Sequence, residues 1–219
     1  MTISEELFEN FCVDQGIPCD RVREGEQRQP DYIICPCGQT VIVEIKQFDP
    51  TPEEEELARQ LDEKKSILVN KSPPGRRVRT AIQSGYPQLK ALGKGRYPTI
   101  LLLFNNVIVA DHADPYDIKT GMFGLEVVDM VVPHDTQRSP YAAERRFGGK
   151  RRVTPGERKS LSSVAVLFHR REGNALMVFH NPFAALPLPV ECLSGPNFFH
   201  YRIEEKSPGH FQDWVAVTS

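Results

Sequence analysis

The sequence predicts an α/β protein with a mixed central sheet, flanked by helices and extended by further strands toward the C-terminus. Three observations predict this class. An amphipathic helix pattern opens the chain, a pair of short strand-like runs follows it, and helical and strand patterns then alternate. The last part of the chain contains strand-like runs with no helical periodicity between them. A chain of 219 residues is long enough for one domain with an appendage.

The first two elements are expected to be a helix and a β-hairpin. Residues 3–15 have acidic residues in the first turn and apolar residues on one face, which favours a helix. Residues 31–35 and 40–48 are rich in Ile, Val and Tyr, and the Pro-Cys-Gly-Gln sequence between them is typical of a hairpin turn. In the second run, Glu44 and Lys46 are polar residues two positions apart, so they share one face of the strand.

Two further helices and a buried strand are expected next. Residues 49–65 begin with two prolines and then become rich in Glu, which is typical of a helix start. Residues 76–92 also favour a helix, although Gly85 and Pro87 weaken the pattern. Residues 99–104 form an apolar run of the kind found in buried strands. This order of helix, hairpin, helix and strand is an α/β order.

The second half of the chain is expected to be rich in β-structure. Residues 131–159 are basic and contain Pro and Gly, so we expect a long loop. Four strand-like runs follow the loop, at residues 162–168, 175–180, 197–203 and 214–217. The expected organisation is a core of residues 1–130, the loop of residues 131–159, and a β-rich C-terminal extension of residues 160–219 packed on the core.

Composition excludes several classes of protein. Hydrophobic residues make up 40% of the chain and charged residues 26%, which is ordinary for a globular protein and unlike a disordered one. No apolar run approaches the roughly 20 residues of a membrane span, and the start MTISEELFENF is acidic, unlike a signal peptide. We therefore expect a cytoplasmic protein without a membrane partner, and we expect its five cysteines to be reduced thiols.

The charges are segregated along the chain, although the net charge is only −2. Residues 64–110 contain nine Lys and Arg residues and no acidic residue, and a second basic block covers residues 138–159. Such clusters can bind a phosphate backbone, but a basic run is more often a solvated face. On their own, the basic clusters therefore do not establish a nucleic-acid partner.

Two carboxylates near the hairpin suggest metal-dependent hydrolysis. Asp31 begins the first strand-like run and Glu44 lies in the second, so the right register would place both carboxylates beside one cation. The backbone carbonyl of Ile45 adds a third oxygen ligand. Lys46 shares a face with Glu44 and can orient the attacking water or stabilise charge on a phosphate.

The structural alternative is that Asp31 is only a turn residue, and that Glu44 and Lys46 pair on a solvated face. The remaining residues of that strand are apolar on both faces, whereas a solvated face would alternate with an apolar one. We therefore favour the metal site.

These residues resemble a known signature. Pro30-Asp31, a twelve-residue spacer, and Glu44-Ile45-Lys46 on a hydrophobic strand are similar to the motif of the PD-(D/E)XK, or restriction-endonuclease-like, nucleases. The order of elements is also similar to the core of that family, most closely to archaeal-type Holliday junction resolvases. The resemblance covers residues 3–110, about half of the chain.

The resemblance implies a restriction-endonuclease-like core, Mg²⁺ or Mn²⁺ as cofactor, DNA as substrate, and a homodimer. In this family the first helix often adds an acidic residue to the metal site, and Glu5 and Glu9 are the candidates here. On the later helix, Arg76, Arg79 and Gln83 are spaced as one polar stripe and resemble the nucleic-acid-binding helix of many members. For both helices the alternative is a solvated face.

The predicted function is therefore a Mg²⁺-dependent nuclease that hydrolyses DNA, which includes branched or structured DNA. The alternative is a catalytically silent nucleic-acid-binding or scaffold subunit of a repair or defence assembly with the same fold. Binding of Mg²⁺ would distinguish the two.

Overall fold

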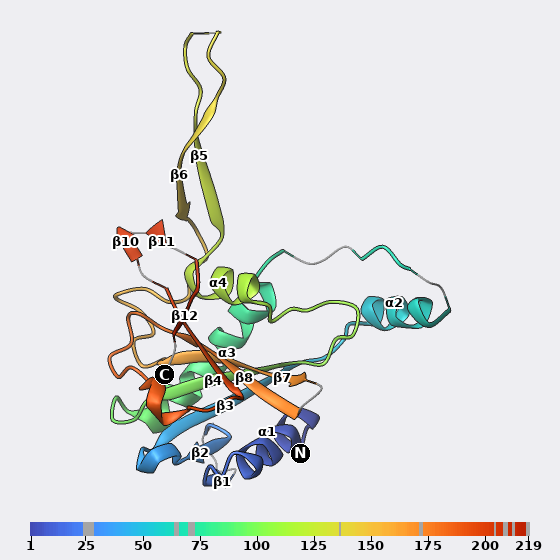
Figure 1. The fold of residues 1–219 in the computed structure, drawn as a ribbon, viewed down its shortest axis with the longest axis vertical. Coiled ribbons are helices and arrows are strands. Elements are labelled where there is room, and N and C mark those ends of the chain that lie inside the picture. The colour runs from blue at the N-terminus through green and yellow to red at the C-terminus, as the bar shows by residue number, and fades with distance from the viewer. Residues whose placement is uncertain are drawn as a thin grey trace.

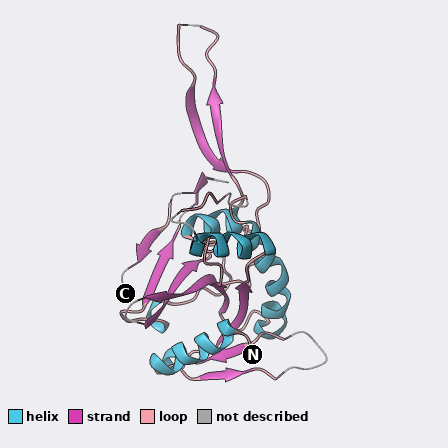
Figure 2. Cartoon of the chain, turned by 90° about the vertical axis from the view of Figure 1, so that its right-hand side faces the viewer, coloured by secondary structure: helices cyan, strands magenta, loops and turns pink. Residues whose placement is uncertain are grey.

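The computed structural model of this chain describes residues 1–23, 29–63, 66–69, 73–135, 137–170, 173–203, 205–207, 210–211 and 213–217. Its centre is an eight-stranded mixed sheet with helices on both faces (Figures 1 and 2). The predicted α/β class with a large mixed sheet is confirmed. None of the helices that the structure describes combines the length and apolar character of a membrane span.

Four α-helices and twelve strands make up the described elements. The helices are α1 (Ile3–Asp14), α2 (Pro52–Glu63), α3 (Arg76–Gly93) and α4 (Pro115–Phe123), and two short 3₁₀ helices are η1 (Pro36–Gly38) and η2 (Val190–Cys192). The strands are β1 (Cys19–Arg21), β2 (Tyr32–Ile34), β3 (Val41–Phe48), β4 (Thr99–Asn105), β5 (Glu126–Val131), β6 (Tyr141–Phe147), β7 (Ser163–Arg170), β8 (Gly173–His180), β9 (Phe198–Arg202), β10 (Glu205–Ser207), β11 (His210–Phe211) and β12 (Val215–Val217).

The eight strands of the large sheet lie in the order β1-β2-β3-β4-β7-β8-β9-β12. Strands β3, β4 and β7 are parallel, and β2 is antiparallel to β3, as the predicted hairpin requires. Beyond β7, strand β8 runs antiparallel, β9 is parallel to β8, and β12 closes the edge.

The C-terminal strands are therefore part of the central sheet. Strand β7 pairs directly with β4, so residues 163–217 continue the sheet sideways instead of packing on a finished core. The sequence pattern predicted these strands but not their neighbours in the sheet. Strand pairing joins segments that are far apart in the sequence, and local periodicity carries no information about it.

The side chains of β3 are divided between two hydrophobic cores. Val41, Val43 and Ile45 pack with apolar residues of α1, whereas Ile42 and Phe48 pack with those of α3 and α4. Because successive side chains of a strand point to opposite faces, the even-numbered residues of β3 face α3. Glu44 and Lys46 therefore lie under α3, on the face opposite α1.

The predicted loop of residues 131–159 is only partly a loop. Strand β6 lies within it and pairs antiparallel with β5, so the expected boundary at residue 130 falls inside β5. The two strands form a separate two-stranded sheet that projects from the body (Figure 1). The prediction missed this hairpin because neither strand shows the alternation of apolar and polar residues that a half-buried strand has.

Candidate functional site

Asp31 and Glu44 are brought together by the register of the hairpin. Tyr32 pairs with Val43 and Ile33 with Ile42, so Asp31 stands opposite Glu44 one position beyond the ladder. The Asp31 carboxylate oxygen Oδ2 accepts a hydrogen bond from the backbone N–H of Ile45 at 2.7 Å. The carbonyl of a strand residue points to the same side as its N–H. We therefore expect the Ile45 carbonyl, the third predicted ligand, to face Asp31.

Glu44 is fully buried, with 0% of its surface exposed, and its two oxygens differ in their partners. Oε1 accepts a hydrogen bond from the ammonium of Lys46 at 2.6 Å. Oε2 is buried and has no hydrogen-bond partner among the described residues. The side-chain amide of Gln88 on α3 lies close enough to Glu44 to favour its ionised form, and one N–H of the same nitrogen donates a hydrogen bond to the Gln29 carbonyl at 3.2 Å.

Burial shifts the protonation of both carboxylates. Loss of solvation raises the pKa of Glu44 to about 7, and the negative charge of Asp31 adds to this, while Lys46 opposes it. Burial also raises the pKa of Asp31, and the hydrogen bond from Ile45 works against that shift. A carboxylate that titrates near neutral pH and carries an unpaired oxygen is a typical feature of functional sites.

Helix α3 covers this site at a glycine. A Cβ atom added to Gly85 would lie 2.8 Å from the Leu101 side chain and 3.1 Å from Cγ of Glu44. The glycine therefore allows the helix to approach β3 and β4 closely. Gly85 weakened the helix prediction, yet it lies where α3 packs against Glu44.

A pocket of about 480 Å³ adjoins Lys46 at the end of β3. Its lining residues are Lys46, Gln47, Phe48, Asp49, Thr51, Arg76, Arg77, Thr80, Ala81 and Ser84. The lining includes two arginines of the first turn of α3, hydroxyl groups and a buried aromatic ring. The pocket therefore offers cationic and hydrogen-bonding groups next to the Glu44–Lys46 pair.

The predicted residue Arg76 is exposed in this pocket, and its neighbour Arg77 has a different role. Arg77 donates a hydrogen bond to Glu54 of α2 at 2.5 Å, and Glu54 also bonds to the buried His112 at 2.6 Å. These three residues join the start of α2 to the body beside the pocket. No local motif identifies them, because they come from three segments that only the fold brings together.

Arg79 does not share the exposed surface of Arg76 and Gln83. Arg79 is buried and donates a hydrogen bond to the Thr120 carbonyl of α4 at 3.2 Å, and burial lowers its pKa. Gln83 is exposed, but its side-chain oxygen accepts a hydrogen bond from Arg152 at 3.0 Å. The prediction of an exposed stripe is therefore wrong at Arg79, which packs against α4, a helix without a clear signal in the sequence. The nucleic-acid-binding role of Arg76 and Gln83 stays a prediction.

Glu5 and Glu9 lie on α1, and both already have partners there. Glu5 completes a capping box with Thr2 and forms a salt bridge with Arg21 at 2.8 Å. Glu9 accepts a hydrogen bond from the hydroxyl of Tyr32 at 2.7 Å. Neither side chain joins Glu44, because α1 covers the opposite face of the sheet. The charge of Glu5 nevertheless contributes to the raised pKa of Asp31.

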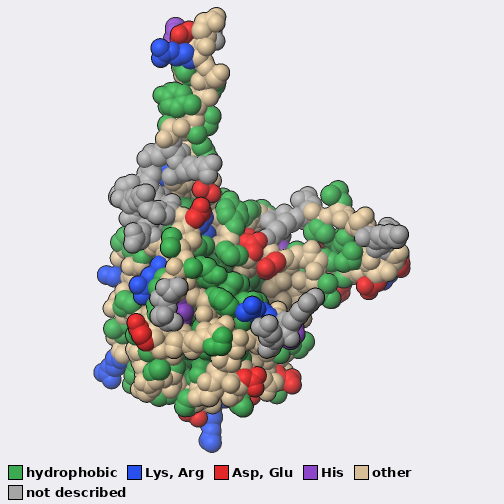
Figure 3. All heavy atoms as spheres, in the orientation of Figure 1, with side chains coloured by type: hydrophobic (Ala, Val, Ile, Leu, Met, Phe, Trp, Pro, Cys, Tyr) green, Lys and Arg blue, Asp and Glu red, His purple; other side chains and the backbone are tan. Residues whose placement is uncertain are grey.

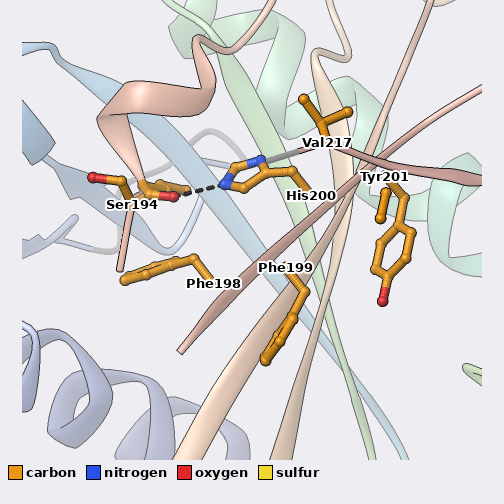
Figure 4. A pocket seen from close by; sticks show the side chains of 8 residues that line it. Ser194, Phe198, Phe199, His200, Tyr201 and Val217 are labelled. Atoms are coloured by element: carbon orange, nitrogen blue, oxygen red, sulfur yellow. Dashed lines mark hydrogen bonds between the residues drawn. The ribbon is translucent and has the colours of Figure 1, made fainter. Parts of the chain in front are cut away.

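A second pocket, of about 300 Å³, is lined by residues of β9 and β12 and by Leu193 and Ser194 (Figure 4). His200 points into it between Phe198 and Tyr201, and its Nε2 donates a hydrogen bond to the Leu193 carbonyl at 2.6 Å. Its Nδ1 therefore accepts from His180 at 2.9 Å, and burial lowers the pKa of His180 to about 3. Both imidazoles are neutral and already bonded, so this pocket is a weaker candidate for hydrolysis.

Across the part of the chain that the structure describes, no three His, Cys, Asp or Glu side chains group closely enough to hold a metal ion. A cation at the hairpin would depend on two carboxylates, a backbone carbonyl, water and substrate. Comparisons of the chain with protein-family models, with curated proteins and with solved structures find no match.

Proposed function

We propose that this protein is a metal-dependent nuclease, and that Asp31, Glu44 and Lys46 carry the reaction. The observation that supports this most strongly is the unpaired Oε2 of Glu44, which is buried beside a second carboxylate. A buried anion without a partner is costly unless a proton or a cation satisfies it. The proposed partner of this oxygen at neutral pH is Mg²⁺ or Mn²⁺.

The ligand atoms available here suit Mg²⁺ better than a metal that is coordinated by protein ligands alone. Mg²⁺ typically binds one or two carboxylates, retains several waters and shares the substrate's phosphate oxygens. Asp31, Glu44 and the carbonyl of Ile45 would hold it. When bound, the cation supplies Lewis-acid chemistry, because it neutralises phosphate charge and lowers the pKa of water.

Lys46 has the position of an electrostatic catalyst. Its ammonium reaches from Oε1 of Glu44 toward the pocket, so it can donate a hydrogen bond to the attacking water or to the phosphate. Arg76, which lines the same pocket, can bind a neighbouring phosphate. Duplex or branched DNA as substrate, and action in the cytoplasm, are inferences from the sequence and its family resemblance.

We infer that α1, β2, β3, α3 and β4 form a restriction-endonuclease-like core. The antiparallel β2–β3 hairpin, the parallel β3–β4 pair and the helices on opposite faces support it.

The Glu44–Lys46 ion pair favours the rival function of a catalytically silent nucleic-acid-binding or scaffold subunit. The pair satisfies Lys46 and one carboxylate oxygen without any metal, as a structural ion pair would. Under that function the protein binds DNA, does not bind Mg²⁺ at this site and cleaves nothing.

The experiment is a cleavage assay with Mg²⁺ or Mn²⁺ and labelled linear, branched and single-stranded DNA. We expect cleavage by the wild type and its loss in Glu44→Gln and Asp31→Asn, which remove charge but almost no volume. Asp14→Asn, an exposed carboxylate at the end of α1, is the matched control and should cleave normally. Cleavage at the wild-type rate by both site variants would overturn the assignment.

A further inference from the structure

The turn of the β2–β3 hairpin meets a distant segment of the chain at two cysteines. Cys37 lies in η1, which forms this turn, and Cys192 is the last residue of η2, between β8 and β9. The two short helices contact each other, although Cys37 and Glu191 are 154 positions apart in the sequence. Both cysteines are free thiols, and neither has a part in the proposed nuclease reaction.

Each of these thiols bonds to the segment that carries the other. The Cys37 thiol donates a hydrogen bond to the Glu191 carbonyl at 3.5 Å, and the Cys192 thiol donates one to the side-chain oxygen of Gln39 at 2.9 Å. Both cysteines also line one pocket of about 190 Å³. Burial raises the pKa of the Cys192 thiol, and the nearby Cys37 adds to that shift. The two thiols therefore share one small volume between η1 and η2.

The backbone of Cys37 is in the left-handed conformation, with φ of 49° and ψ of 30°. A residue other than glycine rarely adopts this conformation, and it persists only where the surrounding structure holds it. In this conformation the Cys37 thiol reaches the Glu191 carbonyl of η2. Backbone strain of this kind is concentrated at functional positions, which suggests a function for the Cys37 side chain.

The arrangement suits a pair of thiols better than a metal site. Cys35 lines the same pocket, yet no three His, Cys, Asp or Glu side chains among the described residues are grouped closely enough to hold a metal ion. A structural Zn²⁺ site needs four ligands. A disulfide needs only two sulfur atoms whose backbones lie close together, as those of η1 and η2 do.

We propose that Cys37 and Cys192 are a modification site, at which hydrogen peroxide oxidises the two thiols to a reversible disulfide. Of the five cysteines, Cys37 is the exposed one, so its sulfur meets the oxidant first. The Cys37 sulfur attacks one peroxide oxygen and the O–O bond breaks. The products are the sulfenic acid of Cys37 and one water, which takes up the thiol proton of Cys37.

The second step closes the disulfide. The Cys192 sulfur attacks the sulfenic sulfur of Cys37, and the S–O bond breaks. The hydroxyl group leaves with the Cys192 proton as a second water. The two thiols thus lose two electrons, and one molecule of hydrogen peroxide gains them. Both thiols make only weak hydrogen bonds, so little is lost when they turn toward each other.

The disulfide would join the N-terminal hairpin to the connection between β8 and β9. It would close a loop of more than 150 residues, and a cross-link over so long a loop restricts the unfolded chain strongly. Cys37 lies at the turn of the hairpin, whereas Asp31 lies at its open end. The proposed modification therefore does not depend on the proposed nuclease function.

The thiol pair is far from the apolar part of the surface. Hydrophobic side chains lie along the projecting β5–β6 hairpin (Figure 3). Strand β2, which leads into η1, lies at the opposite end of the molecule (Figure 1). A partner that covers the β5–β6 hairpin would therefore leave Cys37 open to a small oxidant.

The test is to treat the reduced full chain with hydrogen peroxide, block the remaining thiols with N-ethylmaleimide and map the peptides by mass spectrometry without reductant. We expect a cross-linked peptide that contains Cys37 and Cys192, the loss of two of the five free thiols, and recovery of both with dithiothreitol. The oxidised chain should have a thermal midpoint roughly 5–15 °C above that of the reduced chain.

Serine variants identify the two sulfur atoms, because serine keeps the hydrogen bonds of a thiol and the reduced variants should fold like the wild type. Cys37→Ser and Cys192→Ser should each lose the cross-link and the rise in thermal midpoint. Cys35→Ser, in the same pocket, is the matched control and should retain both. In Cys192→Ser the sulfenic acid of Cys37 has no thiol to condense with, so dimedone should label Cys37.

A cross-link between Cys37 and Cys35 would overturn the inference, as would its persistence in Cys192→Ser. Five thiols that survive a peroxide treatment sufficient to oxidise free cysteine would also overturn it. Oxidation of Cys37 to a sulfinic acid in the wild type, without a disulfide, would show that Cys192 does not reach it. None of these measurements involves DNA or Mg²⁺, so the inference and the proposed nuclease function succeed or fail separately.

Discussion

Asp31 stands opposite Glu44 across the β2–β3 hairpin, yet the two carboxylates are satisfied in different ways. Asp31 accepts a backbone hydrogen bond from Ile45, whereas Glu44 accepts one from the Lys46 ammonium and leaves its second oxygen unpaired. The pKa of Glu44 is raised to about 7 as a result of its burial. The first prediction follows from this asymmetry and concerns folding stability.

The stability of the metal-free protein should fall as the pH rises from about 4.5 to about 7. Glu44 ionises at its ordinary pKa in the unfolded chain but holds its proton up to about pH 7 in the folded one. The folded state therefore binds more protons in that window, and its advantage is lost as the pH passes through the folded pKa. A shift of this size corresponds to a cost on the order of 3 kcal/mol above pH 7.

Glu44→Gln has no carboxylate to ionise, so it should be more stable than the wild type at pH 8 and similar to it near pH 5. Urea unfolding of both proteins across this range measures the difference. Mg²⁺ should reduce the difference at pH 8, because it binds the ionised wild-type site. A difference that does not change with pH would contradict the raised pKa.

The second prediction concerns Arg76 and the salt dependence of DNA binding. Arg76→Gln should reduce the slope of log K against log salt by about 0.9 if the side chain contacts one phosphate of duplex DNA. Arg202→Gln, which removes an exposed arginine at the end of β9, is the control and should keep the wild-type slope. Filter binding or fluorescence anisotropy at several salt concentrations gives both slopes. An unchanged slope in Arg76→Gln would exclude this pocket as a phosphate-binding surface.

The third prediction concerns Gly85. In an exposed helix, replacing Gly by Ala stabilises by up to about 1 kcal/mol. Here the new Cβ would lie 2.8 Å from Cδ1 of Leu101, so either the buried Leu101 side chain or α3 must shift beside Glu44. We therefore expect Gly85→Ala to lower the free energy of unfolding and to reduce cleavage as well. Gly156→Ala, where a Cβ meets nothing within 4 Å, should leave both unchanged.

Local sequence patterns predicted the helices and strands of the first half of the chain, because the residues of each element themselves show the periodicity that is typical of it. Helix α1, the β2–β3 hairpin, α3 and β4 begin and end within a few residues of their predicted bounds. The alternation of β3 also placed Glu44 and Lys46 on one face. The polar stripe on α3 was wrong because Arg79 is covered by α4, and exposure is a property of the whole fold.

Other residues of the site could not be predicted from local patterns. Gln88 reaches Glu44 only because Gly85 allows α3 to lie close to β3. The sequence around His112 favours a surface residue, yet His112 is buried and bonded to Glu54, 58 positions earlier in the chain. Contacts between residues so far apart in the sequence depend on the topology of the fold, which a single sequence without homologues does not reveal.

The last prediction distinguishes the role of Lys46 from that of the carboxylates. Lys46→Met removes the ammonium and keeps an apolar stem, so packing under α3 should survive. Losing one electrostatic stabiliser of the transition state typically costs about 10²- to 10³-fold in turnover. Binding of Mg²⁺ should be retained at pH 8.5, because a positive charge that competes with the cation has gone. Removing Lys46 raises the pKa of Glu44 further, so the affinity for Mg²⁺ should weaken more steeply below pH 8 than in the wild type.

Isothermal titration with Mg²⁺ and single-turnover cleavage separate these effects, and Lys46→Arg is the control that keeps the charge. A catalytic lysine gives a variant that folds, binds Mg²⁺ and cleaves slowly, with partial recovery in Lys46→Arg. If Lys46 is only structural, the main effect of Lys46→Met is a lower free energy of unfolding, because Oε1 of Glu44 loses the Lys46 ammonium. A variant that folds, binds Mg²⁺ and cleaves at the wild-type rate would show that Lys46 takes no part in the reaction.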